Sequence, residues 1–306
     1  MNRKPSEVFE STVQDVDGKY GRSLPFGLSV AEQEGSEVSY RTIQVAIEDN
    51  IATITLNRPE KKNAMNPTMH HEMSSVLDEL EYDEAVRVLV ITGAGDSFCA
   101  GQDLKEYFYD LQDKPADRAR ARREAEWRAN RLRLFPKPTI AAVNGWCFGG
   151  AFTIVASCDI AVAAEEAVFG LSEVNFGKLP GGHVTRAVTD HLHPKDALFY
   201  ILTGRTFDGK KAAEMKFVTY AVPKARLMEE VKTLAGELAK KNPVVLRSAK
   251  EAYRYNLAMD YEVAGAWLTA KSNELNYLSG DTWKNGVEQF KRGEFRPGLG
   301  NYEWER

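Results

Sequence analysis

Residues 139–153 are TIAAVNGWCFGGAFT, and this stretch decides much of the fold. The apolar run TIAAV is typical of a buried strand, and a pair of glycines follows it closely. Paired glycines after a strand indicate that something approaches the backbone. No Lys-Ser or Lys-Thr follows, as a phosphate-binding P-loop requires, and no serine lies between the glycines as in a nucleophile elbow. The question is therefore what the amides of this loop bind.

Two further segments have a related character. GAGDSFCAGQDL, residues 93–104, follows the apolar pattern VRVLVIT and also places small residues where a strand ends. Two backbone N–H groups that converge on one point form an oxyanion hole, and losing one donor raises the activation barrier by about 3 kcal/mol. The third segment, FGLSEVNFG, supplies one acid, Glu173, between apolar neighbours. Such neighbours raise the pKa of a carboxyl group and suit it to proton transfer near neutral pH.

Strand and helix patterns alternate through most of the chain. TIQVAIEDNIATITL alternates apolar and polar residues on both sides of EDN, residues 48–50, which predicts a β-hairpin. Asn66-Pro67 predicts a helix N-cap with proline at the first helical position, and apolar residues follow at helical spacing: Met69, Met73, Val76, Leu77 and Leu80. VRVLVITG, TIAAVNG, CDIAVAA and AVFGLSE predict further strands. The alternation predicts an α/β fold with helices packed outside sheet layers.

Composition divides the chain into three regions. Residues 1–40 are polar and predict an arm without a role in the chemistry, residues 41–240 carry the strand patterns, and residues 241–306 are helical. The first residues contain no apolar run, so no signal peptide is expected, and no run is long enough to cross a membrane. Three scattered cysteines and a net charge of −4 indicate a cytoplasmic protein without disulfides, metal or nucleic acid.

One segment and five histidines need separate interpretation. PADRARARREAEWRANRLRLF carries seven arginines between Arg118 and Arg133, and its interleaved acids favour a solvated helical face over an RNA-binding stripe. The same solvated interpretation applies to His70 and His71, which lie on the first long helix. For His183 we expect a hydrogen bond within its own loop, although a place in a substrate pocket is the alternative. His191 and His193 have no partner ligands beside them in the sequence, so no metal site is predicted.

Taken in order, six blocks resemble the crotonase (enoyl-CoA hydratase/isomerase) superfamily over residues 41–300. The blocks are LNRPEKKNAM, GAGDSFCAGQDLKEY, KPTIAAVNGWCFGG, CDIAVAAEEAVFGLSEVNFG, LPGG and LTGRTFDGKKAAEM. DLKEYF, NGWCFGGAF, FGLSEVN and KNPVVLRSAK further resemble the hydroxycinnamoyl-CoA (feruloyl-CoA) hydratase-lyases. The resemblance implies a spiral of ββα repeats with a helical C-terminal trimerisation region, assembled as homotrimers or homohexamers. It also implies an acyl-CoA substrate and no permanently bound cofactor.

The resemblance assigns roles to individual residues. It implies that the amides of Gly150 and Gln102 bind the thioester oxygen and that Glu173 transfers protons. The residues that it places around the acyl group are Tyr107, Gly149, Thr153, Phe176, Trp267 and Thr269. The residues that it places along CoA are Lys61, Lys62, Ala64 and Ala100.

At four positions the sequence departs from the patterns of the families that it resembles. Thr153 replaces the first of the two glutamates found in many hydratases, and the hydratase-lyases lack that acid as well. Gln102 replaces a methionine of the hydratase-lyases, Thr269 replaces a tyrosine that binds the substrate phenol, and Phe176 replaces a tryptophan. The resemblance therefore implies a site with one acid, in which a substrate phenol is recognised differently than in the hydratase-lyases. Trp267 fits a core or interface position as well as a pocket.

Three functions remain open from the sequence. The first is hydration of an aryl-propenoyl-CoA followed by retro-aldol cleavage to an aromatic aldehyde and acetyl-CoA. The second is an enoyl-CoA hydratase that stops before C–C cleavage. The third is an RNA-associated binding protein on the same scaffold, against which Glu173 and both glycine loops argue. The scaffold also hosts hydrolases and isomerases.

Overall fold

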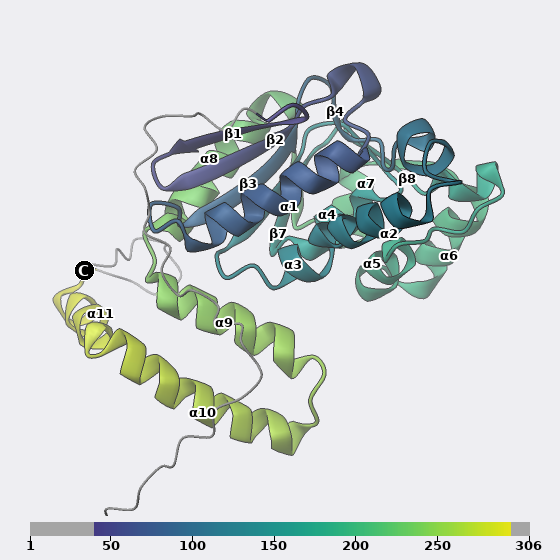
Figure 1. The fold of residues 1–306 in the computed structure, drawn as a ribbon. Coiled ribbons are helices and arrows are strands. Elements are labelled where there is room, and N and C mark those ends of the chain that lie inside the picture. The colour runs from purple at the N-terminus through teal and green to yellow at the C-terminus, as the bar shows by residue number, and fades with distance from the viewer. Residues whose placement is uncertain (1–39, 295–306) are drawn as a thin grey trace, which may run out of the picture. The chain divides into compact units, whose positions relative to one another are not determined.

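The computed structural model describes residues 40–294, so the predicted arm lies outside the described residues except for Tyr40. The chain enters the fold through the antiparallel hairpin of β1 (Ile43–Glu48) and β2 (Ile51–Leu56) (Figure 1). Asp49 and Asn50 connect these strands at φ values of 51° and 64°. Positive φ at both central residues is the requirement of a type I′ turn, which matches the twist of the two strands. The predicted hairpin is confirmed.

The large sheet continues from this hairpin in parallel. Its strand order is β1-β2-β3-β5-β7-β10, and every pair after the first is parallel. The added strands are β3 (Val88–Gly93), β5 (Thr139–Val143), β7 (Ile160–Ala164) and β10 (Tyr220–Val222). Helix α1 (Pro67–Tyr82) lies in front of this sheet in Figure 1 and α8 (Leu227–Ala239) lies behind it. Asn66 caps α1 by accepting from the Met69 amide, as its sequence predicts.

A second, smaller sheet has the order β4-β6-β8-β9. Its strands are β4 (Ser97–Cys99), β6 (Trp146–Phe148), β8 (Val168–Gly170) and β9 (Thr206–Asp208). The first three are parallel, and each follows one parallel strand of the large sheet: β4 follows β3, β6 follows β5 and β8 follows β7. The chain thus adds one strand to each sheet per repeat, which is the expected spiral of ββα units.

An aromatic cluster joins the small sheet to the helices around it. The rings of Phe152 and Phe169 lie 6.1 Å apart, Phe152 and Phe217 lie 4.7 Å apart, and Phe169 stacks on Phe207 at 5.3 Å. Burying one such side chain stabilises the fold by about 1.5–3 kcal/mol. Phe152 belongs to α4 (Ala151–Ser157), so this packing fixes the helix that starts directly after the glycine pair.

The described residues end in three helices, as predicted for this region: α9 (Pro243–Asn256), α10 (Tyr261–Ser279) and α11 (Thr282–Arg292). From α9, Lys250 and Arg254 reach Asp159 at 2.7 and 3.2 Å. Ser248 is the one buried residue of these three helices. Among the helices that the structure describes, none has the length and apolar character needed to cross a membrane.

Candidate active site

Three parallel strands of the small sheet end at one edge, and each is followed by one predicted site residue. Gln102 follows β4, Gly150 follows β6 and Glu173 follows β8. Since β6 pairs in parallel with both of the other strands, the carboxyl ends of all three lie side by side. Ligands of parallel sheets bind beyond such ends. The fold therefore brings the two predicted amide donors and the predicted acid to the same edge.

The backbone amides of Gln102 and Gly150 have no hydrogen-bond partner in the part of the chain that the structure describes. Gln102 pairs with Met65 in an isolated parallel bridge. That bridge uses the Gly101 carbonyl and the Asp103 amide, each 2.8 Å from its partner atom on Met65. Within residues 40–294, neither the Gln102 nor the Gly150 N–H donates to another group. A Cβ atom on Gly101, whose φ is 94°, would lie 3.5 Å from Gly150 N, so the two loops run close together. Two such amides can donate to one carbonyl oxygen.

The Glu173 carboxyl group lies against the glycine pair. Its Oε2 atom is buried and has no hydrogen-bond partner in the described part of the chain. A Cβ atom on Gly149 would lie only 2.9 Å from Oε1, and the φ of this glycine is 50°. Glycine is required here for both reasons. Partial removal from water raises the pKa of Glu173 above its ordinary value, the direction that suits a carboxyl group to proton exchange.

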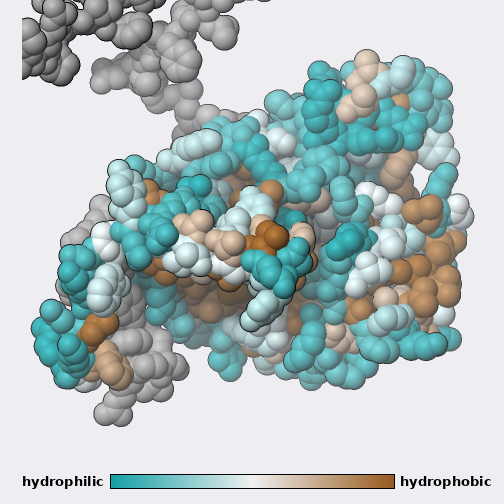
Figure 2. All heavy atoms as spheres, turned by 90° about the horizontal axis from the view of Figure 1, so that it is seen from below, coloured by the Kyte–Doolittle hydropathy of each residue, from teal (hydrophilic) through white to brown (hydrophobic). Residues whose placement is uncertain are grey.

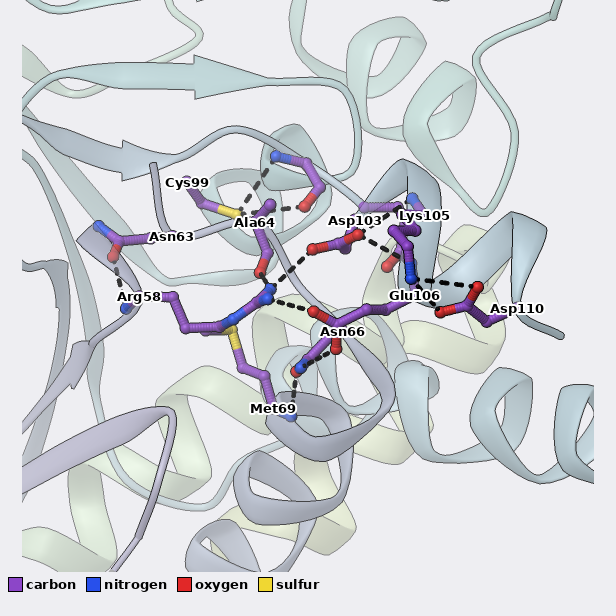
Figure 3. A network of polar contacts seen from close by, with 12 residues as sticks. Arg58, Asn63, Ala64, Asn66, Met69, Cys99, Asp103, Lys105, Glu106 and Asp110 are labelled. Atoms are coloured by element: carbon purple, nitrogen blue, oxygen red, sulfur yellow. Dashed lines mark hydrogen bonds and ion pairs between the residues drawn. The ribbon is translucent and has the colours of Figure 1, made fainter. Parts of the chain in front are cut away.

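A buried ion-pair network holds the loop that carries Gln102 (Figure 3). Arg58 Nη1 donates to the Ala64 carbonyl at 2.6 Å and to Asp103 Oδ2 at 3.0 Å. Arg58 Nη2 donates to Glu106 Oε1 at 2.6 Å. Asp103 also accepts from the amide of Glu106 at 2.9 Å and so caps the helical turn Leu104–Tyr109. Because Asp103 directly follows Gln102, these bonds fix the direction of the neighbouring peptide group.

A second polar chain fixes the side chain of Gln102. Trp127 Nε1 donates to His70 Nδ1 at 3.1 Å, and His70 Nε2 lies 2.8 Å from Gln102 Oε1. Since an indole N–H can only donate, Nδ1 accepts and Nε2 carries the hydrogen. Burial, followed by the charge of Arg128, lowers the pKa of His70 to about 3, so the ring is neutral. The prediction that His70 lies on a solvated face is wrong, because the residue is 0% exposed.

The arginine-rich segment is not one continuous solvated helix. A turn and a break at Ala129, with φ of −110° and ψ of −90°, separate α2 (Pro115–Glu124) from α3 (Asn130–Arg133). The turn directs Trp127 and Arg128 inward, where they are 1% and 6% exposed. The prediction of a solvated face is therefore wrong for Arg128. It is confirmed for four arginines of α2: Arg118, Arg120, Arg122 and Arg123.

Tyr107 and Thr153 lie near these loops, whereas Phe176 faces solvent. The ring of Tyr107 meets His70 edge-on at 5.5 Å, and burial raises the pKa of its phenol. Thr153 is 2% exposed, and its hydroxyl donates to the Gly182 carbonyl at 3.5 Å. Phe176 is 62% exposed. Thr153 also lines a hollow of about 710 Å³ between α4, α5 (Val184–His191) and α9.

The two C-terminal candidates are not brought to the strand edge within the chain. Trp267 packs on Tyr255 with ring centroids 5.8 Å apart, which joins α10 to α9. The Thr269 hydroxyl donates to the Gly265 carbonyl of its own helix at 2.9 Å and is exposed. Among the described residues, neither side chain has a polar or ring contact with Glu173.

The residues assigned to CoA lie on two neighbouring loops: Lys61, Lys62 and Ala64 follow β2, and Ala100 follows β4. Lys61 is exposed, whereas Lys62 Nζ lies 3.7 Å above the ring of Trp146 in a cation–π contact. The Ala100 amide donates to the Lys62 carbonyl at 2.9 Å, and the Ala64 carbonyl accepts from Arg58 as described. The two loops are thus joined through their backbones. Lys61 is the more available of the two cations.

The other histidines have local partners. His71 Nδ1 lies 3.1 Å from Glu124 on the solvated face, as predicted. His183 Nδ1 lies 3.8 Å from Glu126, on another element, rather than in a bond within its own loop as we expected. His191 bonds the Ala187 carbonyl and His193 caps α6 (Pro194–Thr203). Within residues 40–294, no three His, Cys, Asp or Glu side chains are grouped so that they could hold a metal ion.

The repeated ββα unit and the site at the edge of its small sheet define an enzyme of the crotonase fold. Residues 46–294 match the enoyl-CoA hydratase/isomerase family, and the chain belongs to this family. It is 46% identical to a hydroxycinnamoyl-CoA hydratase-lyase of Pseudomonas fluorescens over 87% of this chain and 98% of that protein. The protein is thus an enzyme of the hydratase/lyase type.

Two other relatives show the breadth of the family. A probable enoyl-CoA hydratase of Bacillus subtilis is 34% identical over 81% of this chain and 95% of its own length. The crystal structure of an enoyl-CoA hydratase from Bacillus anthracis superimposes with a TM-score of 0.74, covering 83% of this chain and 97% of that chain at 27% identity. The fold is thus shared with enzymes that carry the hydratase name alone.

Proposed function

We propose that the protein is a CoA-thioester lyase that hydrates an aryl-propenoyl-CoA, such as feruloyl-CoA or 4-coumaroyl-CoA, and then cleaves the hydrated product. The observation that carries the proposal is the unpaired, buried carboxyl oxygen of Glu173 beside two free backbone amides. The hydroxycinnamoyl-CoA hydratase-lyase of P. fluorescens supports the same reaction. The products are an aromatic aldehyde and acetyl-CoA.

The amides of Gln102 and Gly150 bind the thioester oxygen in this proposal. Negative charge moves onto that oxygen when the α-carbon becomes enolate-like, and fixed dipoles stabilise the charge without reorganising. One donor of this kind lowers the barrier by about 3 kcal/mol. Because the backbone donates at both positions, the side chain of Gln102 remains available to the acyl group.

Glu173 moves the protons of both steps. In hydration, its carboxylate takes a proton from water, the water oxygen bonds to the β-carbon, and Glu173 returns the proton to the α-carbon of the enolate, which regenerates the carboxylate. In cleavage, Glu173 takes the proton of the β-hydroxyl group, the Cα–Cβ bond breaks, and the electron pair forms the enolate of acetyl-CoA. Proton return to that enolate completes the cycle. No Schiff-base lysine is needed, because the thioester accepts the electrons, and Thr153 cannot replace a second acid.

Further residues complete the substrate site in this proposal. Tyr107, Gly149 and Thr153 line the acyl group, while CoA follows the loop around Lys61. The other residues assigned to CoA on that surface are Lys62, Ala64 and Ala100. Phe176, Trp267 and Thr269 take part only if another subunit covers the exposed face on which each of them lies.

We also propose that the enzyme works as a homotrimer or homohexamer in the cytoplasm. The C-terminal helices leave large apolar side chains exposed, among them Leu268, Tyr277 and Phe290. Figure 2 shows more hydrophobic residues at its right-hand edge, the side on which α5 and α6 lie in Figure 1. Exposed apolar surface of this extent is typical of subunit interfaces. Light scattering during gel filtration tests the assembly, and a monomeric mass would contradict it.

The reaction is tested by incubating the enzyme with feruloyl-CoA, 4-coumaroyl-CoA, cinnamoyl-CoA and crotonyl-CoA. We expect an aromatic aldehyde and acetyl-CoA from at least one aryl ester, identified by mass. A β-hydroxyacyl-CoA product without aldehyde would instead establish the alternative, an enoyl-CoA hydratase without C–C cleavage. The hydratases named among the relatives keep this alternative open. No turnover of any ester would contradict both.

A further inference from the structure

Arg128 is a buried cation without an anionic partner. The residue is 6% exposed, and no carboxylate within residues 40–294 forms an ion pair with it. Its Nε donates to the Ala125 carbonyl at 3.0 Å and its Nη1 to the Gly150 carbonyl at 3.3 Å. Among the described residues its Nη2 has no hydrogen-bond partner, and this nitrogen is not fully buried, so it faces accessible space. A Cβ atom on Gly182 would lie 3.6 Å from this nitrogen.

Arg58 shows what compensation of a buried guanidinium looks like in the same molecule. It is 8% exposed, about as deeply buried as Arg128, but it is paired with both Asp103 and Glu106. A buried ion is strongly unfavourable unless it is paired, and a guanidinium group cannot lose its proton in a protein. Two carbonyl groups give Arg128 only partial compensation. The missing partner is therefore an anion that arrives with a ligand.

The titratable groups around Arg128 do not supply that anion. His70 is neutral, and burial raises the pKa of the Cys99 thiol to about 12 and that of the Tyr107 phenol above its ordinary value. Glu126 interacts with the guanidinium only at longer range, is 43% exposed at its side chain and lies closer to His183. The charge thus remains largely uncompensated in the protein alone.

The polar groups beside Arg128 are hydrogen-bond donors. The chain from Trp127 through His70 occupies Gln102 Oε1, so Gln102 has only its NH2 group left to offer. Tyr107 keeps its phenolic hydrogen at neutral pH. A guanidinium group with an amide NH2 and a phenol nearby favours a group that only accepts hydrogen bonds. A carboxylate or a phenolate meets this requirement, and a guanidinium group binds a carboxylate with two parallel bonds.

We propose that Arg128, with Gln102 and Tyr107 beside it, binds an anionic oxygen group on the aryl ring of the substrate. This inference rests on the proposed function, because it assumes that an aryl-propenoyl-CoA occupies the space next to Gly150. Arg128 contacts the carbonyl of the same glycine whose amide is assigned to the thioester oxygen, so the subsite adjoins the reacting group. Arg128 is then a specificity-determining residue that takes no part in proton transfer.

The test uses saturated CoA esters that bind but cannot react: 3-phenylpropanoyl-CoA, its 3-carboxy and 4-carboxy derivatives, and its 4-hydroxy derivative. Calorimetry should show that wild-type enzyme binds at least one carboxy ester, or the hydroxy ester as its phenolate, at least about 10-fold more tightly than the unsubstituted ester. Phenolate absorbance in the bound 4-hydroxy ester distinguishes the second case. Equal affinity for all four esters, without phenolate absorbance, overturns the proposal.

Variants separate ligand binding from a structural role. Arg128→Gln should remove the preference while changing the affinity for the unsubstituted ester by less than about 3-fold, and Arg128→Lys should restore part of it. Arg123→Gln, which removes an exposed arginine of the same segment, should leave the preference intact. An equal loss of affinity for every ester in Arg128→Gln would assign the residue to the scaffold instead.

These binding measurements also separate the inference from the proposed function. The preference is measured without turnover, so it stands or fails even where no aldehyde is formed. Aldehyde formation without any anion preference would leave the lyase in place and refute the subsite. Should Arg128→Gln fail to fold, the comparison of the four esters with wild-type enzyme still decides the proposal.

Discussion

Glu173 lies against Gly149 and Arg128 lies against Gly150, and neither forms an ion pair within residues 40–294. Glu173 can escape the cost of burial by taking up a proton, and its pKa is raised accordingly. Arg128 cannot release its proton in any accessible pH range. The same electrostatic problem therefore has two outcomes. In our proposals the Glu173 side becomes a proton-transfer site, whereas the Arg128 side keeps a fixed charge that a ligand balances.

The supporting structure differs in the same way. Around Glu173 the neighbouring group is a glycine backbone, which leaves the carboxyl group free to exchange protons. Around Arg128 the chain from Trp127 through His70 to Gln102 holds fixed donors in one orientation. The Glu173 carboxyl group, which can change its charge, has an oxygen without a hydrogen bond. The neutral donors beside Arg128 are instead fixed by hydrogen bonds to one another. The predictions below test whether this division holds.

The largest effect is expected from Glu173→Gln. This variant keeps the shape of the side chain but cannot move protons, so kcat should fall by about 10³–10⁴-fold for every substrate. Binding of saturated CoA esters should stay within about 3-fold of wild type, because no contact of Arg128 changes. Steady-state kinetics and calorimetry measure the two quantities. Near-normal turnover would end the assignment of Glu173.

A smaller loss is expected from Gly149→Ala. The new Cβ atom would lie 2.9 Å from Glu173 Oε1, so the carboxyl group must move and kcat should fall by about 10–100-fold. The positive φ also costs about 1–2 kcal/mol of stability. Gly293→Ala is the matched control, since this glycine has a φ of 74° and open space around it. It should lose similar stability and no activity. An equal loss of kcat in Gly149→Ala and Gly293→Ala would show that backbone strain alone lowers the activity, without displacement of Glu173.

The pH dependence should come from Glu173 and not from Arg128. Desolvation raises the pKa of Glu173 above its ordinary value, and the proposed hydration starts from the ionised carboxyl group. The value of kcat/KM should therefore fall about tenfold per pH unit on an acidic limb that lies above the ordinary carboxyl range. Binding of the saturated neutral ester should stay flat through the same range. A limb at or below 4.5, or one that survives in Glu173→Gln, would contradict this origin.

The strands that lead into the site, β3, β5 and β7, could be predicted from sequence because apolar runs followed by small residues mark where strands of a parallel sheet end. The short strands β4 and β6 were not predicted, because each has only three residues and lies inside a segment that was interpreted as a loop. The order of β4, β6 and β8 then places Gln102, Gly150 and Glu173 together. The places of Trp267 and Thr269 could not be predicted in the same way, because they depend on how α10 packs.

The Arg128 side was harder to predict, for two different reasons. His70 had a usable signal: it lies three residues before Met73 and seven before Leu77, on the apolar stripe of α1. Arg128 had none, because its burial depends on the break at Ala129 that turns the chain inward. Within a run of seven arginines, composition describes the majority and misses the one that the tertiary structure selects.

The smallest effect, a change in stability, is expected from His70→Gln. Wild-type His70 stays neutral to about pH 3 when folded but gains a proton near pH 6.5 when unfolded, so its contribution to stability is lost as the pH falls between these values. The variant has no titrating group at this position, so it does not lose stability in this way as the pH falls. It should be less stable by about 1–3 kcal/mol at pH 7.5, where Trp127 loses its acceptor, and the difference should shrink toward pH 4.5. Thermal unfolding of wild type, His70→Gln and the exposed control His71→Gln measures this. A difference that is constant or grows with acid would mean that His70 is charged in the fold, and that the donors beside Arg128 are not fixed as described.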